Sequence, residues 1–312
     1  MTARFILSLD CEGKWGVADH LGADLHRSLN DAGLRLAYRQ IIELLDEYSL
    51  PATFAFVGCF AEETQSLHRL MPELAHLGSK AADYLGPAIH DMTEGSREGW
   101  HGAWAVEQVA QAPTLHEIAL HGVTHVPWTD LDRKGAYREM ALLAQMETPV
   151  RHARTFIYPR NKIAHQDVLE ASGILGYRLS PPDRSRLSSL TSEFDIWSRP
   201  DADSPASDVI VPIPAGFFVN WQSGLRRLVP NNISLLRARR LLDAAERTGG
   251  VVHYWLHPEN IATAPATLGL LRSILEVVAE RRDKGRCDVL TQQRYVEHHT
   301  GHQSLTLKMG RS

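Results

Sequence analysis

The sequence predicts an α/β fold with a largely parallel sheet. Short apolar runs typical of buried strands recur along the chain, and amphipathic stretches with helical spacing lie between them. Carboxylate and imidazole side chains follow directly after several of these runs, which is where active-site residues collect in parallel sheets. The chain is longer than the usual domain of about 100–200 residues, but one large α/β domain accommodates its 312 residues.

The expected strands and helices alternate in order along the chain. The strands are residues 5–10, 52–57, 117–121, 155–158, 208–213, 251–256 and 288–290. The helices are residues 32–48, 64–77, 134–146, 164–172, 234–247 and 266–281. Asn30 and Ser234 offer N-cap oxygens, and Gly249 with Gly250 is expected to end the helix before it.

Two segments interrupt this alternation, residues 78–113 and 180–207. The first is rich in Gly and Pro and the second in Ser, Pro, Asp and Arg, so we expect both to be loop insertions. Trp100 and Trp104 favour an ordered first loop that shapes a substrate pocket. We therefore expect a single domain over residues 1–300, with residues 301–312 as a flexible C-terminal tail.

Composition excludes several classes of partner. With 33 Lys and Arg against 37 Asp and Glu, the net charge is -4, and the sequence has no basic stripe for a nucleic acid. Three scattered cysteines are too few for a disulfide framework. The first residues lack the pattern of a signal peptide, and no apolar run approaches the roughly 20 residues that cross a bilayer. We expect a cytoplasmic protein without an integral membrane segment.

The first candidate site lies at the end of the opening strand, where Asp10 and Glu12 precede Gly13. Alternate strand residues point to the same side, so these two carboxylates are suitably placed for a metal or for acid–base chemistry. A strand-to-turn junction capped by Asp is the alternative interpretation.

The second candidate site is the pair His121 and His125, directly after another apolar strand. Two imidazoles at this spacing can face one metal if the segment makes a helical turn, and imidazole is a common Zn²⁺ ligand. With 16 histidines in the chain, the spacing could also arise by chance.

The third candidate is His257, which follows the strand at 251–256 and precedes Pro258. A histidine there can protonate a leaving group when its pKa lies near neutrality, although a lone histidine is more often structural. Three strand ends with two carboxylates and three imidazoles match the requirements of metal-assisted amide hydrolysis.

The order and spacing of these motifs resemble the polysaccharide deacetylase family, also called carbohydrate esterase family four. The resemblance covers most of the chain, from Phe5 to about Glu297. It rests on the segments 8–13, 51–58, 121–125, 156–161 and 256–257. It implies a distorted (β/α) barrel of seven to eight mostly parallel strands and a metal-dependent deacetylase.

The same resemblance implies roles for individual residues. Asp10 would be the general base and His257 the general acid, and His121 and His125 would bind a divalent metal with one carboxylate. The metal is expected to be Zn²⁺, with Co²⁺, Ni²⁺ or Mn²⁺ as alternatives. Cys11 stands where the family has its metal-binding Asp, yet Asp10 and Cys11 should point to opposite faces, so we predict Glu12 as the third ligand.

Two further motifs depart from the family. Its third motif carries an Arg beside the catalytic Asp, where this chain has Ile157, with Arg160 three residues later. Its fourth motif orients the final His through an Asp. The best matches here are Asp195, Asp201 and Asp203, although a solvated acidic loop is an equal alternative.

The expected substrate is a small carbohydrate, because aromatic faces stack on sugar rings. We predict substrate-binding roles for Arg160, Asn161, Trp100, Trp104 and Trp128, and treat Trp221 and Trp255 as stacking or core residues. The predicted function is removal of an N-acetyl group from a sugar precursor of surface polysaccharide. The alternatives are hydrolysis of a non-sugar C–N bond on the same scaffold, or an inactive carbohydrate-binding protein. The sequence does not predict an oligomeric state.

Overall fold

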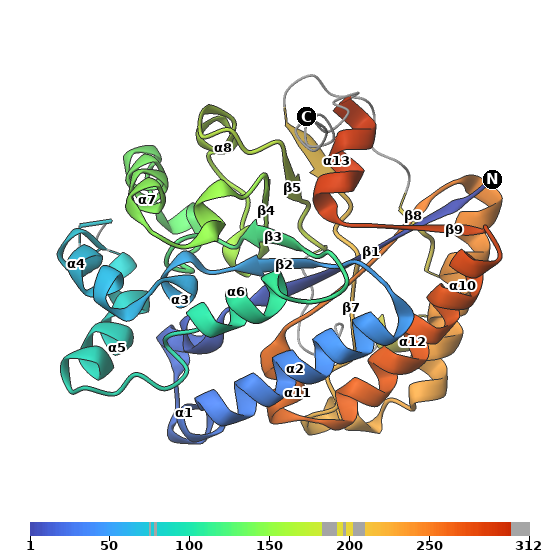
Figure 1. Ribbon diagram of the computed structural model, residues 1–312, viewed down its shortest axis with the longest axis horizontal. Coiled ribbons are helices and arrows are strands. Elements are labelled where there is room, and N and C mark those ends of the chain that lie inside the picture. The colour runs from blue at the N-terminus through green and yellow to red at the C-terminus, as the bar shows by residue number, and fades with distance from the viewer. Residues whose placement is uncertain (75, 78–79, 183–191, 196–197, 202–209, 301–312) are drawn as a thin grey trace, which may run out of the picture.

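A parallel β-sheet forms the centre of the computed structural model, which describes residues 1–74, 76–77, 80–182, 192–195, 198–201 and 210–300. The helices lie around the periphery of this sheet (Figure 1). The strands are β1 (Ala3–Cys11), β2 (Thr53–Phe56), β3 (Glu117–Leu120), β4 (Thr155–Phe156), β5 (Gly176–Arg178), β6 (Val211–Ile213), β7 (Phe217–Phe218), β8 (Val251–Leu256) and β9 (Cys287–Leu290).

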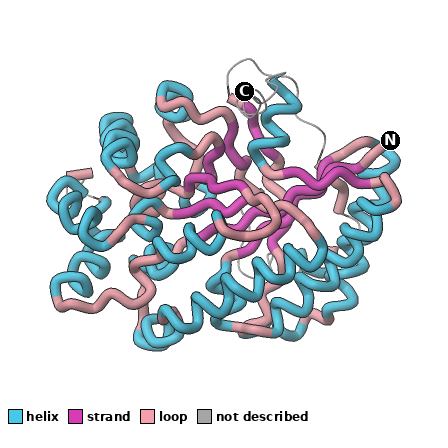
Figure 2. The backbone as a smooth tube through the Cα atoms, viewed as in Figure 1, coloured by secondary structure: helices cyan, strands magenta, loops and turns pink. Residues whose placement is uncertain are grey.

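The sheet order is β6-β5-β4-β3-β2-β1-β8-β7, and every pairing between these strands is parallel. β1 lies near the middle and also pairs with β9 through its first residues. The curled sheet with helices outside it is a distorted (β/α) barrel, as expected (Figure 2). Because β1, β3 and β8 are parallel and close in this order, their carboxyl ends open on one side of the barrel.

Several of the helices pack against the strands of the sheet. The α-helices are α1 (Ala23–Ser28), α2 (Asp31–Tyr48), α3 (Gly58–Ala61), α4 (Thr64–Leu74), α5 (Ala81–Thr93), α6 (Ala103–Ala110), α7 (Arg133–Gln145), α8 (Gln166–Ala171), α10 (Asn231–Thr248), α11 (Pro258–Thr263), α12 (Ala266–Asp283) and α13 (Gln292–Thr300). The 3₁₀ turns are η1 (Gly13–His20), η2 (Trp128–Asp130), η3 (Pro149–His152), η4 (Pro159–Asn161), η5 (Ser192–Phe194) and η6 (Gly224–Leu228). None of the described helices is both long and apolar enough to cross a membrane.

The long predicted elements are confirmed, with shifted ends. Asn30 caps α2 by accepting a hydrogen bond from the Gly33 N–H at 2.9 Å, and Gly249 ends α10 in the left-handed region with φ of 71°. The prediction that Ser234 caps α10 is wrong, because the helix begins at Asn231 and Ser234 is buried inside it.

The prediction of a loop over residues 78–113 is also wrong. α5 and α6 occupy most of this segment, and α5 continues through Pro87. The buried residues of α5 include Leu85, Ala88 and Met92, a helical spacing that the Gly and Pro content obscured. Much of the second expected loop, residues 180–207, and the expected tail, residues 301–312, lie outside the described residues.

Candidate active site

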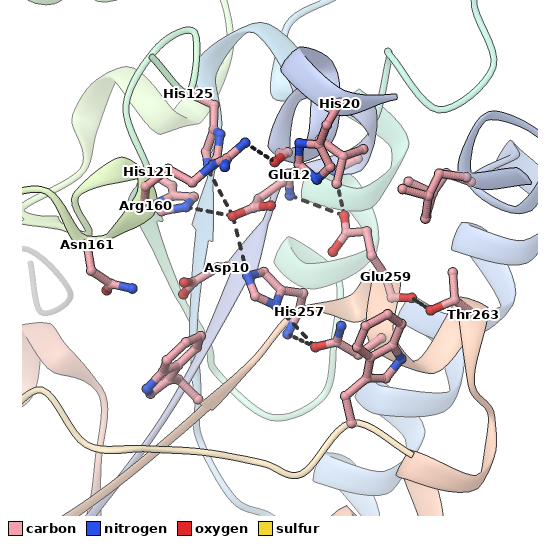
Figure 3. Close-up of a pocket in the computed structure, with 18 residues that line it drawn as sticks. Asp10, Glu12, His20, His121, His125, Arg160, Asn161, His257, Glu259 and Thr263 are labelled. Atoms are coloured by element: carbon pink, nitrogen blue, oxygen red, sulfur yellow. Dashed lines mark hydrogen bonds and ion pairs between the residues drawn. The ribbon is translucent and has the colours of Figure 1, made fainter. Parts of the chain in front are cut away.

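A pocket of about 560 Å³ opens where β1, β3 and β8 end. Asp10 lies on β1, and Glu12 directly follows that strand. His121 and His125 lie in the loop after β3, and His257 directly follows β8 (Figure 3). These three segments are more than 100 residues apart in sequence, and the parallel strand order brings them close together. The carboxylates and imidazoles of the three candidate sites come together at this pocket.

Glu12 lies between the two imidazoles of the loop. Its Oε1 is 2.9 Å from Nε2 of His121 and 3.0 Å from Nε2 of His125, and all three side chains are almost completely buried. The other ring nitrogen of His121, Nδ1, donates to the carbonyl oxygen of Ile157 at 2.8 Å. A carbonyl oxygen only accepts, so in the neutral ring this bond leaves Nε2 of His121 unprotonated.

These donors fit a divalent cation. The lone pair of a neutral His121 at Nε2 faces a carboxylate oxygen, so nothing satisfies both of them except a proton or a cation. A backbone carbonyl that fixes the far nitrogen is the usual support of a metal-bound imidazole. Ligand atoms of Glu12, His121 and His125 all lie within 4.8 Å of one another, and Asp10, Glu12 and His257 form a second such group. Two imidazoles and a carboxylate are a frequent Zn²⁺ ligand set.

A buried carboxyl group holds the loop that carries the two histidines. Glu139 of α7 accepts from the backbone N–H and the hydroxyl of Thr124 at 3.0 and 2.7 Å, and from the indole N–H of Trp128 at 2.6 Å. His125 takes a left-handed conformation with φ of 62°. The segment makes no helical turn, and this loop brings the imidazoles together without one.

Asp10 is held by an arginine that the sequence analysis did not single out. Arg178 of β5 donates from Nη1 to Oδ1 at 2.7 Å and from Nη2 to Oδ2 at 2.6 Å, with both side chains buried. Burial alone would raise the pKa of Asp10, but Arg178 outweighs it and lowers the pKa below its usual value. An Arg inside the apolar run at 174–179 is the signal that could have identified it.

Arg160, the nearest arginine in the third motif, has a different place. It donates to the carbonyl oxygen of Gly16 at 3.1 Å and pairs with Asp19 at the pocket rim. Asn161 lines the pocket and accepts from Arg178 Nη2 at 3.0 Å. Both residues line the pocket and are placed to contact a substrate. Arg178, not Arg160, holds Asp10.

His257 lies across the pocket from His121 and His125. Its Nε2 is 3.4 Å from Oε1 of Glu12, and its Nδ1 is 3.1 Å from Oδ1 of Asn260. Burial opposes its positive charge, but the carboxylates of Glu12, Asp10 and Glu259 outweigh burial and raise the pKa of His257 to about 10. A raised pKa favours the protonated ring that a general acid requires.

The prediction of an Asp that orients His257 is not supported among the described residues. Asn260, on the first turn of α11, makes the Nδ1 contact. Asp195 is exposed and bonds to Ser198 at 2.9 Å, and Asp201 forms a backbone bridge with Val251. Asp203 lies outside the described residues.

Glu259 is a further carboxyl group that sequence reasoning missed. Its Oε1 accepts from the backbone N–H of Gly13 and, at 3.2 Å, from that of Glu12, so it fixes the chain on both sides of the Glu12 side chain. Burial, together with the nearby Glu12 carboxylate, raises the pKa of Glu259 to about 7.

Cys11 points away from this site. It is completely buried in the hydrophobic core, and its Sγ donates to the Leu9 carbonyl oxygen at 3.6 Å. Burial raises the pKa of its thiol well above the usual value, which disfavours the thiolate that a metal needs. The geometry agrees with Glu12 as the third ligand.

The tryptophans that line the pocket are not the ones that the sequence predicted. Trp100 and Trp128 are completely buried, and Trp104 packs its edge against Tyr38, so none of these three lines the pocket. Trp100 and Trp128 are too deeply buried to contact a substrate, and Trp104 lies outside this pocket. The indole N–H groups of all three donate internal hydrogen bonds. Trp221 and Trp255 line the pocket instead.

Comparisons with known proteins show which family model and which solved structures the chain resembles. The polysaccharide deacetylase family model matches residues 29–179, and no curated protein matches the chain. A solved structure from Mycobacterium smegmatis, assigned as a polysaccharide deacetylase, has a TM-score of 0.62 at 19% identity over 96% of this chain and 91% of that one. One with the same assignment from Pseudomonas aeruginosa PAO1 has a TM-score of 0.54 at 13% identity, over 96% and 92%. Puue allantoinase has a TM-score of 0.53 at 13% identity, over 96% and 92%. These structural likenesses show the fold.

Proposed function

We propose that this chain, whose residues 29–179 match the polysaccharide deacetylase family model, is a metal-dependent hydrolase that removes an N-acetyl group from a sugar. The observation that carries this proposal is the arrangement around Glu12. The carboxylate of Glu12 and two imidazoles converge on one point, with the carboxylate of Asp10 and the imidazole of His257 beside them.

The proposed roles follow from charge and position. A divalent cation held by Glu12, His121 and His125 would polarise the acetyl carbonyl group and acidify a water molecule. Asp10, ionised because Arg178 lowers its pKa, accepts a proton as the water oxygen bonds to the acetyl carbon. His257, which is protonated, donates a proton to the sugar nitrogen as the C–N bond breaks. Acetate and a free amino sugar leave.

The pocket supports a small carbohydrate substrate. Its volume of about 560 Å³ lies in the range of small-molecule sites, roughly 300–1,000 Å³. Trp221 and Trp255 offer aromatic surfaces for the apolar face of a sugar ring, and Arg160 and Asn161 offer donors for its hydroxyl groups. We propose a precursor of surface polysaccharide as the natural substrate class.

The test is acetate release from a panel of compounds by protein purified with added Zn²⁺. The panel contains free, nucleotide-linked and lipid-linked N-acetyl sugars together with cyclic amides. Acetate from one of the sugars supports the proposal. Ring opening of a cyclic amide without acetate release would instead assign a non-sugar C–N hydrolase, and binding of sugars by a protein that retains no metal would assign a carbohydrate-binding protein.

A further inference from the structure

Two buried side chains behind Asp10 connect it to the neighbouring strand. Ser8 and Asp10 lie two residues apart on β1, and His253 and Trp255 lie two residues apart on β8. The register pairs Ile6 with His253 and Ser8 with Trp255. His253 therefore lies diagonally beside Ser8, and its Nε2 is 2.8 Å from the Ser8 hydroxyl oxygen.

The tautomer of His253 is determined by its second contact. Its Nδ1 is 2.6 Å from the carbonyl oxygen of Pro214, which only accepts, so Nδ1 carries the proton. Gly216, with φ of 73°, allows this segment to pass close to His253, because a Cβ at Gly216 would lie 2.5 Å from the His253 carbonyl oxygen. Burial, with the nearby positive charge of Arg178, lowers the pKa of His253 to about 3, so the ring is neutral.

The direction of the remaining hydrogen bonds follows. A neutral His253 with its proton on Nδ1 has only a lone pair at Nε2, so the Ser8 hydroxyl must donate to it. The hydroxyl proton then points away from Arg178, and a lone pair of Ser8 accepts from Arg178 Nη1 at 3.2 Å. Without His253, the hydroxyl could rotate and turn its proton toward the guanidinium.

Arg178 transmits this orientation to Asp10. Besides Ser8, its guanidinium contacts Asn161 at 3.0 Å, both oxygens of Asp10, and the Trp255 ring, whose centroid is 4.6 Å from Cζ. These contacts hold the plane of the guanidinium, and the two parallel hydrogen bonds hold the carboxylate in that plane.

We propose that His253 and Ser8 are positioning residues for the reaction, acting through Arg178 to fix the orientation in which Asp10 accepts its proton. The inference rests on the proposed function, because it takes Asp10 as the general base. Neither residue touches the substrate pocket, so both act on the turnover rate rather than on substrate binding.

The kinetic test compares His253→Leu, His253→Gln and Ser8→Ala with His116→Leu, using the best substrate of the panel and metal-loaded protein. His116 is a matched control, because burial also lowers its pKa, to about 4, and its contact is the Ala52 N–H, away from Asp10. We expect His253→Leu and Ser8→Ala each to lower kcat by about tenfold to 100-fold, with KM and metal content unchanged. His253→Gln should retain more activity, since its amide oxygen can accept from Ser8.

The double variant His253→Leu/Ser8→Ala should be no slower than either single variant, because both remove the same constraint. Wild-type kcat in folded His253→Leu, or a loss of kcat in His116→Leu as large as in His253→Leu, would overturn the proposal.

A second measurement is independent of turnover. In wild-type protein, ¹⁵N NMR should show His253 as the neutral Nδ1–H tautomer and Arg178 with separate, slowly exchanging Nη signals. In His253→Gln those Arg178 signals should persist, and in Ser8→Ala they should broaden. An Nε2–H tautomer at His253 would overturn the positioning role of His253 and Ser8 even if no substrate is found. If no compound of the panel releases acetate, that result would count against the proposed function alone.

Discussion

Arg178 on β5 forms two parallel hydrogen bonds with the carboxylate of Asp10 on β1, at 2.7 and 2.6 Å, inside a completely buried pair. These strands are not neighbours in the sheet, so the pair crosses the interior of the barrel. Removing one partner of a buried ion pair typically costs about 3–5 kcal/mol. The ion pair therefore stabilises the fold and also favours the ionised state of Asp10.

Asp10→Asn and His257→Ala should each lower kcat by about 10²–10⁴, the usual effect of a proton-transfer group. Neither belongs to the triad of Glu12, His121 and His125, so metal content should persist. The measurement is kcat with metal analysis on the same samples. A kcat within a few-fold of wild type in either variant would remove that residue from the mechanism.

His121→Ala and His125→Ala should lose both metal and activity. The thermal melting of the barrel should change little, because these proposed ligands lie in a loop beyond the strand. Glu12→Gln should lose metal as well. Cys11→Ser is the matched comparison at the adjacent position, and it should keep the metal. If Glu12→Gln retains the metal and Cys11→Ser loses it, the assignment of Glu12 as the third ligand is wrong.

Glu139→Gln should weaken metal binding by about tenfold to 100-fold, because the Glu139 carboxyl group holds the backbone of the histidine loop through Thr124. Glu117 is a matched control. It is also buried with a raised pKa, but it bonds to Thr53, Thr155 and the start of α13. Metal titration should give wild-type affinity for Glu117→Gln, and equal weakening in both variants would argue for a general loss of stability.

Acid should destabilise the fold through His253. Burial, with Arg178, lowers its folded pKa to about 3 from 6.5, so the unfolded chain binds the extra proton between these values. The stabilisation is complete above pH 6.5 and is lost as the pH falls toward 3, with a slope of up to about 1.4 kcal/mol per pH unit. The free energy of unfolding, measured against pH, should lose this component in His253→Leu. An unchanged slope there would mean that His253 is not buried as a neutral ring.

The sequence predicted the elements whose apolar pattern is long, such as α2 and β8, and it placed Asp10, Glu12, His121, His125 and His257 at strand ends. Parallel topology then brought them together. An Arg inside an apolar run marks Arg178 as unusual, but the sequence could not place it beside Asp10, because β5 has three residues and Asp10 lies 168 positions away.

The tryptophans show a different limit of sequence reasoning. Trp100, Trp128 and Trp255 are equivalent by residue type, and only tertiary packing decides which indole faces the pocket. Asn260 replaced the expected Asp beside His257 because the chain turns directly from β8 into α11. The spacing of apolar residues does not reveal this turn, so it could not predict the contact between Asn260 and His257.

The most direct test is acetate release by protein that is first stripped of metal with a chelator and then titrated with Zn²⁺, using the best N-acetyl sugar of the panel. The site formed by Glu12, His121 and His125 predicts no release from the stripped protein. It predicts a rise to a plateau at one equivalent of metal per chain. Release that is unaffected by the chelator, or no release at any metal ratio from any sugar, would contradict a metal-dependent sugar deacetylase.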